Sequence, residues 1–197
     1  PGDTICEGTG GNTGVGLAMI AAAKGYKAIF AMPESISKEK INSMKLYGAE
    51  VILCENVPFT DQRHYFHVAK EMGKLQGYFF TNQFENLDNG QSHYETTAPE
   101  IFKALNGNIH GFVASAGTGG TISGCSRYLK EKNEDINIYV VDPLGSGLFQ
   151  YVNEKNNTYN EDISPDTTFI KRSEGSSITE GIGIDRITAN YKAANVD

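Results

Sequence analysis

The chain contains Gly111-Phe-Val-Ala-Ser-Ala-Gly-Thr-Gly-Gly-Thr-Ile122, an apolar run followed by a glycine-rich turn. The run from Gly111 to Ser115 predicts a buried strand. Ile122, Cys125 and Leu129 have helical spacing, so we expect a helix directly after the turn. A strand, a glycine-rich turn and a helix in this order are typical of α/β proteins.

The alternation of strand and helix extends outward from this stretch in both directions. Further strands are predicted at 4–7, 27–32, 49–54, 78–81 and 136–142, and helices at 13–24, 65–75 and 92–104. This order implies right-handed crossovers between parallel strands. We therefore expect an α/β fold with open, mostly parallel sheets and helices on both faces. A polar stretch after Gln83 indicates a boundary between domains 1–88 and 89–197, and a polar loop is expected at 155–165.

Composition excludes several classes of protein. The 197 residues include 17 Lys and Arg against 24 Asp and Glu, a formal charge of −7 that would repel a nucleic acid backbone. The sequence has no apolar run of the length that a membrane helix needs. Three cysteines are too few for a disulfide framework and favour a reducing compartment. His64 and His67 lack a third ligand at matching spacing, so no metal is expected.

The turn from Gly117 to Thr121 suits an anion. Its glycines let several backbone N–H groups converge, its threonines add hydroxyls, and the helix N-terminus adds partial positive charge. A phosphate group fits this pattern, and a purely structural turn is the simplest alternative. A dinucleotide site is a third interpretation, because Asp142 ends the next predicted strand. The G-x-G-x-x-G spacing, however, requires glycine where Ile122 stands.

A second glycine-rich turn, Glu7-Gly-Thr-Gly-Gly-Asn-Thr-Gly14, precedes the predicted helix at 13–24. Asn12 and the neighbouring threonines offer amide and hydroxyl donors for a carboxylate or an aromatic hydroxyl. The alternative interpretation is that Asn12 caps the helix. Thr97 and Glu100 have the spacing of a capping box at another helix start.

Taken together, the motifs resemble those of the cysteine synthase and cystathionine β-synthase family, within the tryptophan-synthase-β-like, fold type II pyridoxal-phosphate enzymes. The resemblance covers nearly the whole chain in the family's order. It rests on Pro1-Gly-Asp-Thr-Ile, Gly11-Asn-Thr-Gly14, Met32-Pro-Glu, Leu46-Tyr-Gly-Ala-Glu50, Gln83-Phe, Thr96-Thr-Ala-Pro-Glu-Ile101, Gly117-Thr-Gly-Gly-Thr, Val141-Asp-Pro and Glu180-Gly-Ile-Gly.

The resemblance implies two subdomains with the active site between them: a smaller, mobile domain at 1–88 with the asparagine turn, and part of a larger cofactor-binding domain at 89–197. It assigns Asn12 to the ring hydroxyl of pyridoxal 5'-phosphate. The residues implied to bind the cofactor phosphate are Gly117, Thr118, Gly119, Gly120 and Thr121. Those implied to bind the substrate carboxylate are Thr9, Gly10, Gly11, Thr13 and Gln83, and those implied to line the pocket are Gly181, Ile182 and Gly183.

The implied reaction is β-replacement, which makes L-cysteine from O-acetylserine and sulfide. Cystathionine β-synthase activity with serine and homocysteine is the alternative, for which Val141-Asp-Pro-Leu-Gly-Ser146 is a hint. A non-catalytic amino-acid-binding homologue is the second alternative. The family usually has serine where Gly10 stands, which leaves the substrate preference open. A homodimer is implied, located in the cytoplasm or alternatively in the mitochondrial matrix.

The family's Schiff-base lysine lies upstream of the asparagine turn, in a Ser-x-Lys-Asp/Asn-Arg setting that no lysine here shares. We therefore expect that lysine upstream of Pro1 and assign no catalytic residue within the chain. The group that contacts the pyridine nitrogen is expected beyond Asp197. On this interpretation the chain is a fragment that lacks both ends of the enzyme and is inactive alone.

Overall fold

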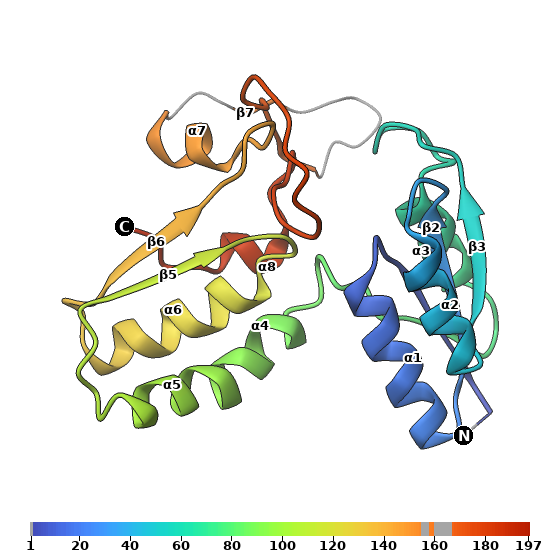
Figure 1. Ribbon diagram of the computed structural model, residues 1–197, viewed down its shortest axis with the longest axis horizontal. Helices are drawn as coiled ribbons and strands as arrows, with labels where there is room; N and C mark the ends of the chain where they lie inside the picture. Colours follow the sequence, from blue (N-terminus) through green and yellow to red (C-terminus); the bar gives the residue numbers. More distant parts are fainter. Residues whose placement is uncertain (1, 155–157, 160–166) are drawn as a thin grey trace. The chain divides into compact units, whose positions relative to one another are not determined.

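The computed structural model describes residues 2–154, 158–159 and 167–197 (Figure 1). The predicted loop at 155–165 lies outside the described residues except for Thr158 and Tyr159. The chain divides into two compact units, Pro1–Gln83 and Phe84–Asp197. This division falls a few residues before position 88, because Glu85 binds within the second unit. Its carboxylate accepts hydrogen bonds from Arg186 Nη1 at 2.6 Å and from the N–H of Ala189 at 2.8 Å.

The first unit contains a four-stranded parallel sheet. Its strands stand in the order β3-β2-β1-β4, and three helices flank them. The elements are β1 (Thr4–Gly8), α1 (Asn12–Lys24), β2 (Lys27–Pro33), α2 (Lys38–Leu46), β3 (Glu50–Cys54), α3 (Tyr65–Met72) and β4 (Tyr78–Phe80).

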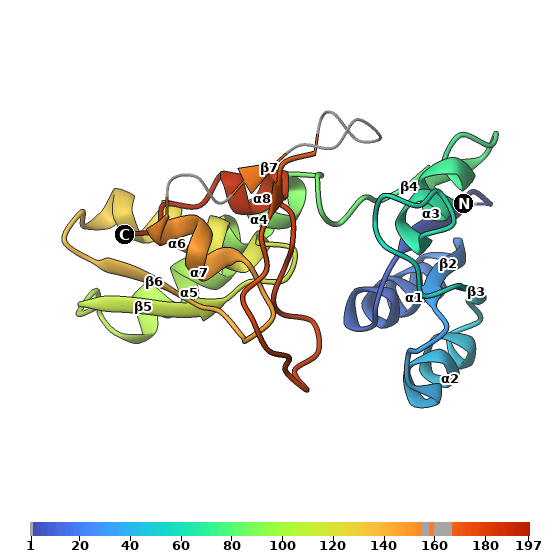
Figure 2. The same cartoon turned by 90° about the horizontal axis from the view of Figure 1, so that it is seen from above.

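The helices of the first unit cover both faces of its sheet (Figure 2). Successive side chains of a strand point to opposite faces, so neighbouring residues of β2 enter different cores. Phe30 packs in one cluster with Ala18 of α1 and Met44 of α2. Ala31 packs in another cluster with Ala69 of α3. The predicted α/β arrangement is confirmed.

The second unit contains a parallel pair of strands, β5 and β6, packed on helix α6. Its remaining elements lie around this centre, and α6 separates the strand pair from α5 (Figure 1). The elements are α4 (Asp88–Ser92), η1 (His93–Thr97), α5 (Ala98–Ala104), β5 (Gly111–Ser115), α6 (Gly120–Lys132), β6 (Asn137–Val141), α7 (Leu148–Asn153), the antiparallel pair β7 (Thr158–Tyr159) and β8 (Phe169–Ile170), and α8 (Ala189–Lys192).

The two faces of the β5–β6 pair differ in burial. Ile138 points into the core with Ile122 and Leu129 of α6. On the other face Val113 and Tyr139 are 60% and 51% exposed. The hydrophobic core of this unit therefore lies on the α6 side of the strand pair.

The helix predicted at 92–104 begins earlier and contains an irregular turn. Helix α4, the π-helical turn η1 and helix α5 follow one another without a break from Asp88 to Ala104. Thr97 lies inside this segment and caps no helix end, so the capping-box prediction for Thr97 and Glu100 is wrong. The predicted strands are confirmed with shifts of at most one residue at each end. Within the described ranges, no helix combines the length and apolar character needed to cross a membrane.

Candidate functional site

The asparagine turn is the glycine-rich stretch from Thr9 to Asn12 that joins β1 to α1, and a buried threonine anchors it. Thr9 is 1% exposed, and its N–H donates to the carbonyl of Ala31 at 3.0 Å. Thr9 Oγ1 accepts from the N–H of Gly11 at 3.1 Å. Helix α1 begins at Asn12 with Gly11 as its N-cap, and no side chain caps it. The alternative interpretation of Asn12 as the helix cap is therefore wrong.

The Asn12 side chain is exposed and makes no hydrogen bond to any residue in the described part of the chain. Its amide is thus free to donate to a ligand at the start of α1. Gly11 lies against the side chain of Lys40, because a Cβ atom at Gly11 would be 3.0 Å from Lys40 Nζ. The helix N-terminus and this ammonium group together make the turn attractive to an anion.

Thr13 and Gln83 are in direct contact although they are far apart in the sequence. The Thr13 hydroxyl donates to Gln83 Oε1 at 2.6 Å, and Gln83 Nε2 donates to the carbonyl of Gly8 at 2.8 Å. The structure therefore brings Gln83 to the turn that contains the other predicted carboxylate-binding residues of the first unit.

A buried carboxylate holds Gln83 in place. Glu7 is fully buried and accepts hydrogen bonds from the N–H groups of Gly8 and Gln83, at 2.9 and 3.0 Å, and from the hydroxyl of Thr81. Burial raises the pKa of Glu7, and these hydrogen bonds offset part of that increase. The sequence analysis did not identify Glu7 as a supporting residue. The available signal was an acid at the end of an apolar strand.

The turn from Gly117 to Thr121 follows β5 in the second unit. Gly119 adopts a left-handed conformation with φ of 90° and is the N-cap of α6. The backbone N–H groups of Gly117 to Thr121 donate to no described residue. No acidic residue lies in the first turn of α6. Free N–H groups, two hydroxyls and a helix N-terminus form a donor set that fits a phosphate monoester.

The segment from Gly181 to Gly183 lies beside this turn within the same unit. A Cβ atom on Gly117 would be 2.1 Å from the carbonyl oxygen of Gly181, and the N–H of Gly183 donates to the carbonyl of Ala116 at 2.8 Å. The structure thus brings two predicted site segments together, the cofactor-binding turn and the segment that lines the substrate pocket.

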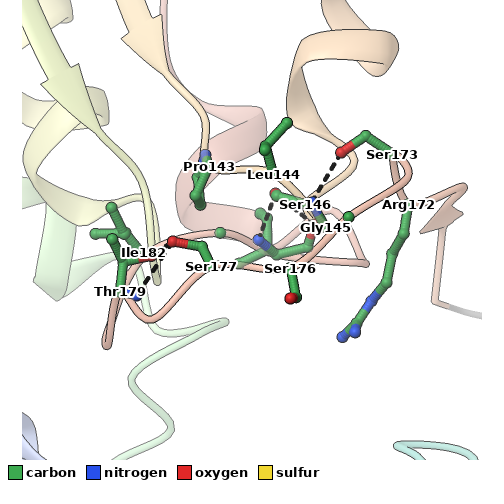
Figure 3. Close-up of a pocket in the computed structure, with 13 residues that line it drawn as sticks. Pro143, Leu144, Gly145, Ser146, Arg172, Ser173, Ser176, Ser177, Thr179 and Ile182 are labelled. Carbon is green, nitrogen blue, oxygen red and sulfur yellow. Dashed lines mark hydrogen bonds between the residues drawn. The ribbon is translucent and has the colours of Figure 1, made fainter.

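Ile182 and Gly183 line a pocket of about 290 Å³ in the second unit (Figure 3). Several of its polar groups bind one another: Ser177 Oγ lies 2.9 Å from Thr179 Oγ1, and Ser146 Oγ donates to the carbonyl of Ile184 at 3.0 Å. The other lining residues are Pro143, Leu144, Gly145, Arg172, Ser173, Gly175 and Ser176.

Three residues that the sequence analysis did not identify contact the turn from Gly117 to Thr121. Asn89 Nδ2 donates to Thr118 Oγ1 at 2.9 Å, and His93 Nε2 lies 3.2 Å from Thr121 Oγ1. Thr188 Oγ1 donates to the carbonyl of Thr118 at 2.7 Å. All three lie on segments far from this turn in the sequence, so no local pattern could connect them with it.

Asp142, the residue behind the dinucleotide interpretation, makes a hydrogen bond within the second unit. Asp142 Oδ2 accepts from the N–H of Phe149 in the first turn of α7, at 2.9 Å. His64 caps α3, and His67 is buried against the carbonyl of Phe59. Among the described residues, no group of three His, Cys, Asp or Glu side chains is arranged for a metal ion.

The chain is similar to curated cysteine synthases over nearly its whole length. Over 98% of this chain and 48% of the other protein, the chain is 43% identical to cysteine synthase 1 of Neurospora crassa. Cysteine synthase of Dictyostelium discoideum is 37% identical over 100% of this chain and 51% of its own length. The chain therefore spans about half the length of these curated relatives.

The chain is also similar to enzymes of known structure. The O-acetylserine dependent cystathionine beta-synthase of Helicobacter pylori matches with a TM-score of 0.78 and 34% identity, over 98% of this chain and 56% of that one. A hydrogen sulfide-producing enzyme of Fusobacterium nucleatum matches with a TM-score of 0.69 and 43% identity, over 75% and 49%. The family described as "Pyridoxal-phosphate dependent enzyme" matches residues 1–196. With its parallel sheets and its glycine-rich turn from Gly117 to Thr121, the chain belongs to this family of pyridoxal-phosphate dependent enzymes.

Proposed function

We propose that the complete protein makes L-cysteine from O-acetylserine and sulfide by β-replacement. The observation that carries the proposal is the polar cluster at the start of α1, where the Asn12 amide, which has no partner among the described residues, neighbours the Thr13–Gln83 pair. Such a cluster suits an amino acid that must be held by its carboxylate. The names of the curated relatives support cysteine synthesis.

Each part of the chain has a role in this proposal. The N–H groups from Gly117 to Thr121 hold the cofactor phosphate, and Asn12 donates to the cofactor's ring hydroxyl. Gln83 and the N-terminus of α1 bind the substrate carboxylate, the Thr13 hydroxyl holds the Gln83 amide in place, and the Gly181–Gly183 segment borders the substrate. When bound, the cofactor withdraws electrons from the amino acid's α-carbon. The Schiff-base lysine, the domain roles, the homodimer and the cytoplasmic location stay predictions.

Cystathionine β-synthase activity is the second candidate. It is favoured by the likeness to the Helicobacter pylori protein, which is named as an O-acetylserine dependent cystathionine beta-synthase. Both candidates use the same cofactor and the same type of carboxylate site. They differ in the nucleophile, which is sulfide or homocysteine, and they also differ in the leaving group when the second candidate uses serine in place of O-acetylserine.

An assay of the complete protein with each pair of substrates separates the candidates. We expect cysteine from O-acetylserine and sulfide, with kcat/KM at least about tenfold higher than for cystathionine from serine and homocysteine, a difference of about 1.4 kcal/mol. Faster cystathionine formation would favour the second candidate. An amino acid that binds without any replacement of its β-substituent would indicate a non-catalytic homologue.

Gly10→Ser is expected to strengthen amino-acid binding. Gly10 is exposed, and a Cβ atom there would meet nothing within 4 Å, so a serine fits without moving the turn. The new hydroxyl can donate to the substrate carboxylate, which is worth about 0.5 to 1.5 kcal/mol, or roughly two- to tenfold in affinity.

Titration of the complete protein with O-acetylserine, followed by the cofactor's absorption, measures this gain. Gly10→Ala is the matched control, because it adds the carbon atom without the hydroxyl and should leave the affinity unchanged. An equal change in both variants would show that the turn does not bind the carboxylate.

A further inference from the structure

We propose that Asn89 and His93 are positioning residues that turn the hydroxyl protons of Thr118 and Thr121 toward a phosphate bound at the Gly117–Thr121 turn. This inference rests on the proposed cofactor site at that turn. It assigns a role to two side chains that belong to neither proposed binding set.

The two side chains lie one helical turn apart on the same face of the continuous segment formed by α4 and η1. Glycines allow this segment to lie close to α6. A Cβ atom on Gly124 would be 2.2 Å from the carbonyl oxygen of Gly90, and one on Gly120 would be 2.0 Å from Asn89 Oδ1. The contact brings both polar side chains within hydrogen-bonding distance of the threonine hydroxyls.

Asn89 fixes the direction of the Thr118 hydroxyl. A hydroxyl has one proton to donate and two lone pairs that accept. Because Asn89 Nδ2 donates to Thr118 Oγ1 at 2.9 Å, the Thr118 oxygen acts as the acceptor in this bond. The Thr118 proton has no acceptor among the described residues, so it is available to a phosphate oxygen.

His93 acts on Thr121 through a short chain of hydrogen bonds. His93 Nδ1 lies 2.9 Å from Thr97 Oγ1, and Nε2 lies 3.2 Å from Thr121 Oγ1. Burial lowers the pKa of His93, which keeps the imidazole neutral at neutral pH with one donor and one acceptor nitrogen. When Thr97 donates to Nδ1, Nε2–H donates to Thr121, and the Thr121 proton is free for the phosphate.

The irregular turn of the backbone lies at the same residues as this chain of hydrogen bonds. The π-helical turn η1 begins at His93 and ends at Thr97, the two residues whose side chains are bonded. Turns of this type occur frequently at functional sites. The irregular turn thus contains the hydrogen bond between the His93 and Thr97 side chains.

The test compares pyridoxal 5'-phosphate with pyridoxal, which lacks the phosphate, on the cofactor-free complete protein. Asn89→Asp keeps the size of the side chain but replaces the donor with an acceptor that captures the Thr118 proton. We expect it to weaken binding of pyridoxal 5'-phosphate by about tenfold or more, the effect of one lost bond to a charged group. Binding of pyridoxal should not change. Asn137→Asp, which adds the same charge at the start of β6, should alter neither affinity.

His93→Leu should show the same selective loss, and His93→Gln should restore part of it, because the glutamine amide can donate to Thr121. In a Thr118→Val background, Asn89→Asp should have little further effect, since the hydroxyl through which it acts is gone. Equal losses for both ligands, or an undiminished effect in that background, would overturn the proposal. If the wild-type protein itself does not prefer the phosphorylated ligand, the proposed cofactor site is wrong instead.

Discussion

Gly117→Ala is expected to lower the affinity of the complete protein for pyridoxal 5'-phosphate by about a hundredfold, which corresponds to about 3 kcal/mol at the upper end of overpacking costs. The added Cβ atom would lie 2.1 Å from the carbonyl oxygen of Gly181. The backbone fixes the position of the Cβ atom, and the oxygen is itself a backbone atom, so no side-chain rotation relieves the contact. The turn must move away from the Gly181–Gly183 segment, and the convergence of its N–H groups is lost.

The measurement is a titration of the cofactor-free protein, accompanied by thermal unfolding. Gly111→Ala is the matched control at the other end of β5, because its Cβ atom would make only an ordinary contact, 3.6 Å from the carbonyl oxygen of Asn137. The control should bind the cofactor with nearly wild-type affinity. Unchanged affinity in Gly117→Ala would mean that this turn does not hold the phosphate.

The fold could be predicted from the sequence because its signals are local. Buried parallel strands such as Gly111–Ser115 are short apolar runs, and glycine-rich turns mark the carboxyl ends of two of them. The helix starts were less predictable. Thr97 has the residue type and spacing of a cap, yet it lies within a continuous helix, because packing against α6 extends that helix back to Asp88.

The sequence predicted the site residues that belong to a motif. It did not predict the residues that hold these site residues in place. Glu7, Asn89 and His93 make their contacts across 28 to 76 residues of sequence. Their partners are known only once the sheets and helices are assembled. A buried carboxylate such as Glu7 is also uncommon at the end of a strand, and the hydrogen-bond donors that surround it in the fold account for it.

Asn12→Ala is expected to reduce affinity for the cofactor, or for the cofactor with its bound amino acid, by about ten- to hundredfold. The free energy of unfolding should change by less than about 0.5 kcal/mol, as for other exposed side chains without partners. The reason for this separation is geometric. Asn12 is the first residue of α1, its amide caps no helix end, and its side chain is exposed.

His64→Ala provides the opposite case within the same unit. His64 Nδ1 accepts from the N–H of Phe66 and so caps α3, and its ring contacts Phe59 at a centroid distance of 5.4 Å. Its removal should cost about 0.5 to 2 kcal/mol of stability, as loss of a helix cap does, while cofactor affinity stays near the wild-type value. Thermal unfolding and cofactor titration are measured for both variants, and each variant should change only one of the two quantities. If Asn12→Ala lost stability and kept its affinity, the Asn12 amide would act on the fold, and its assignment to the cofactor's ring hydroxyl would fail.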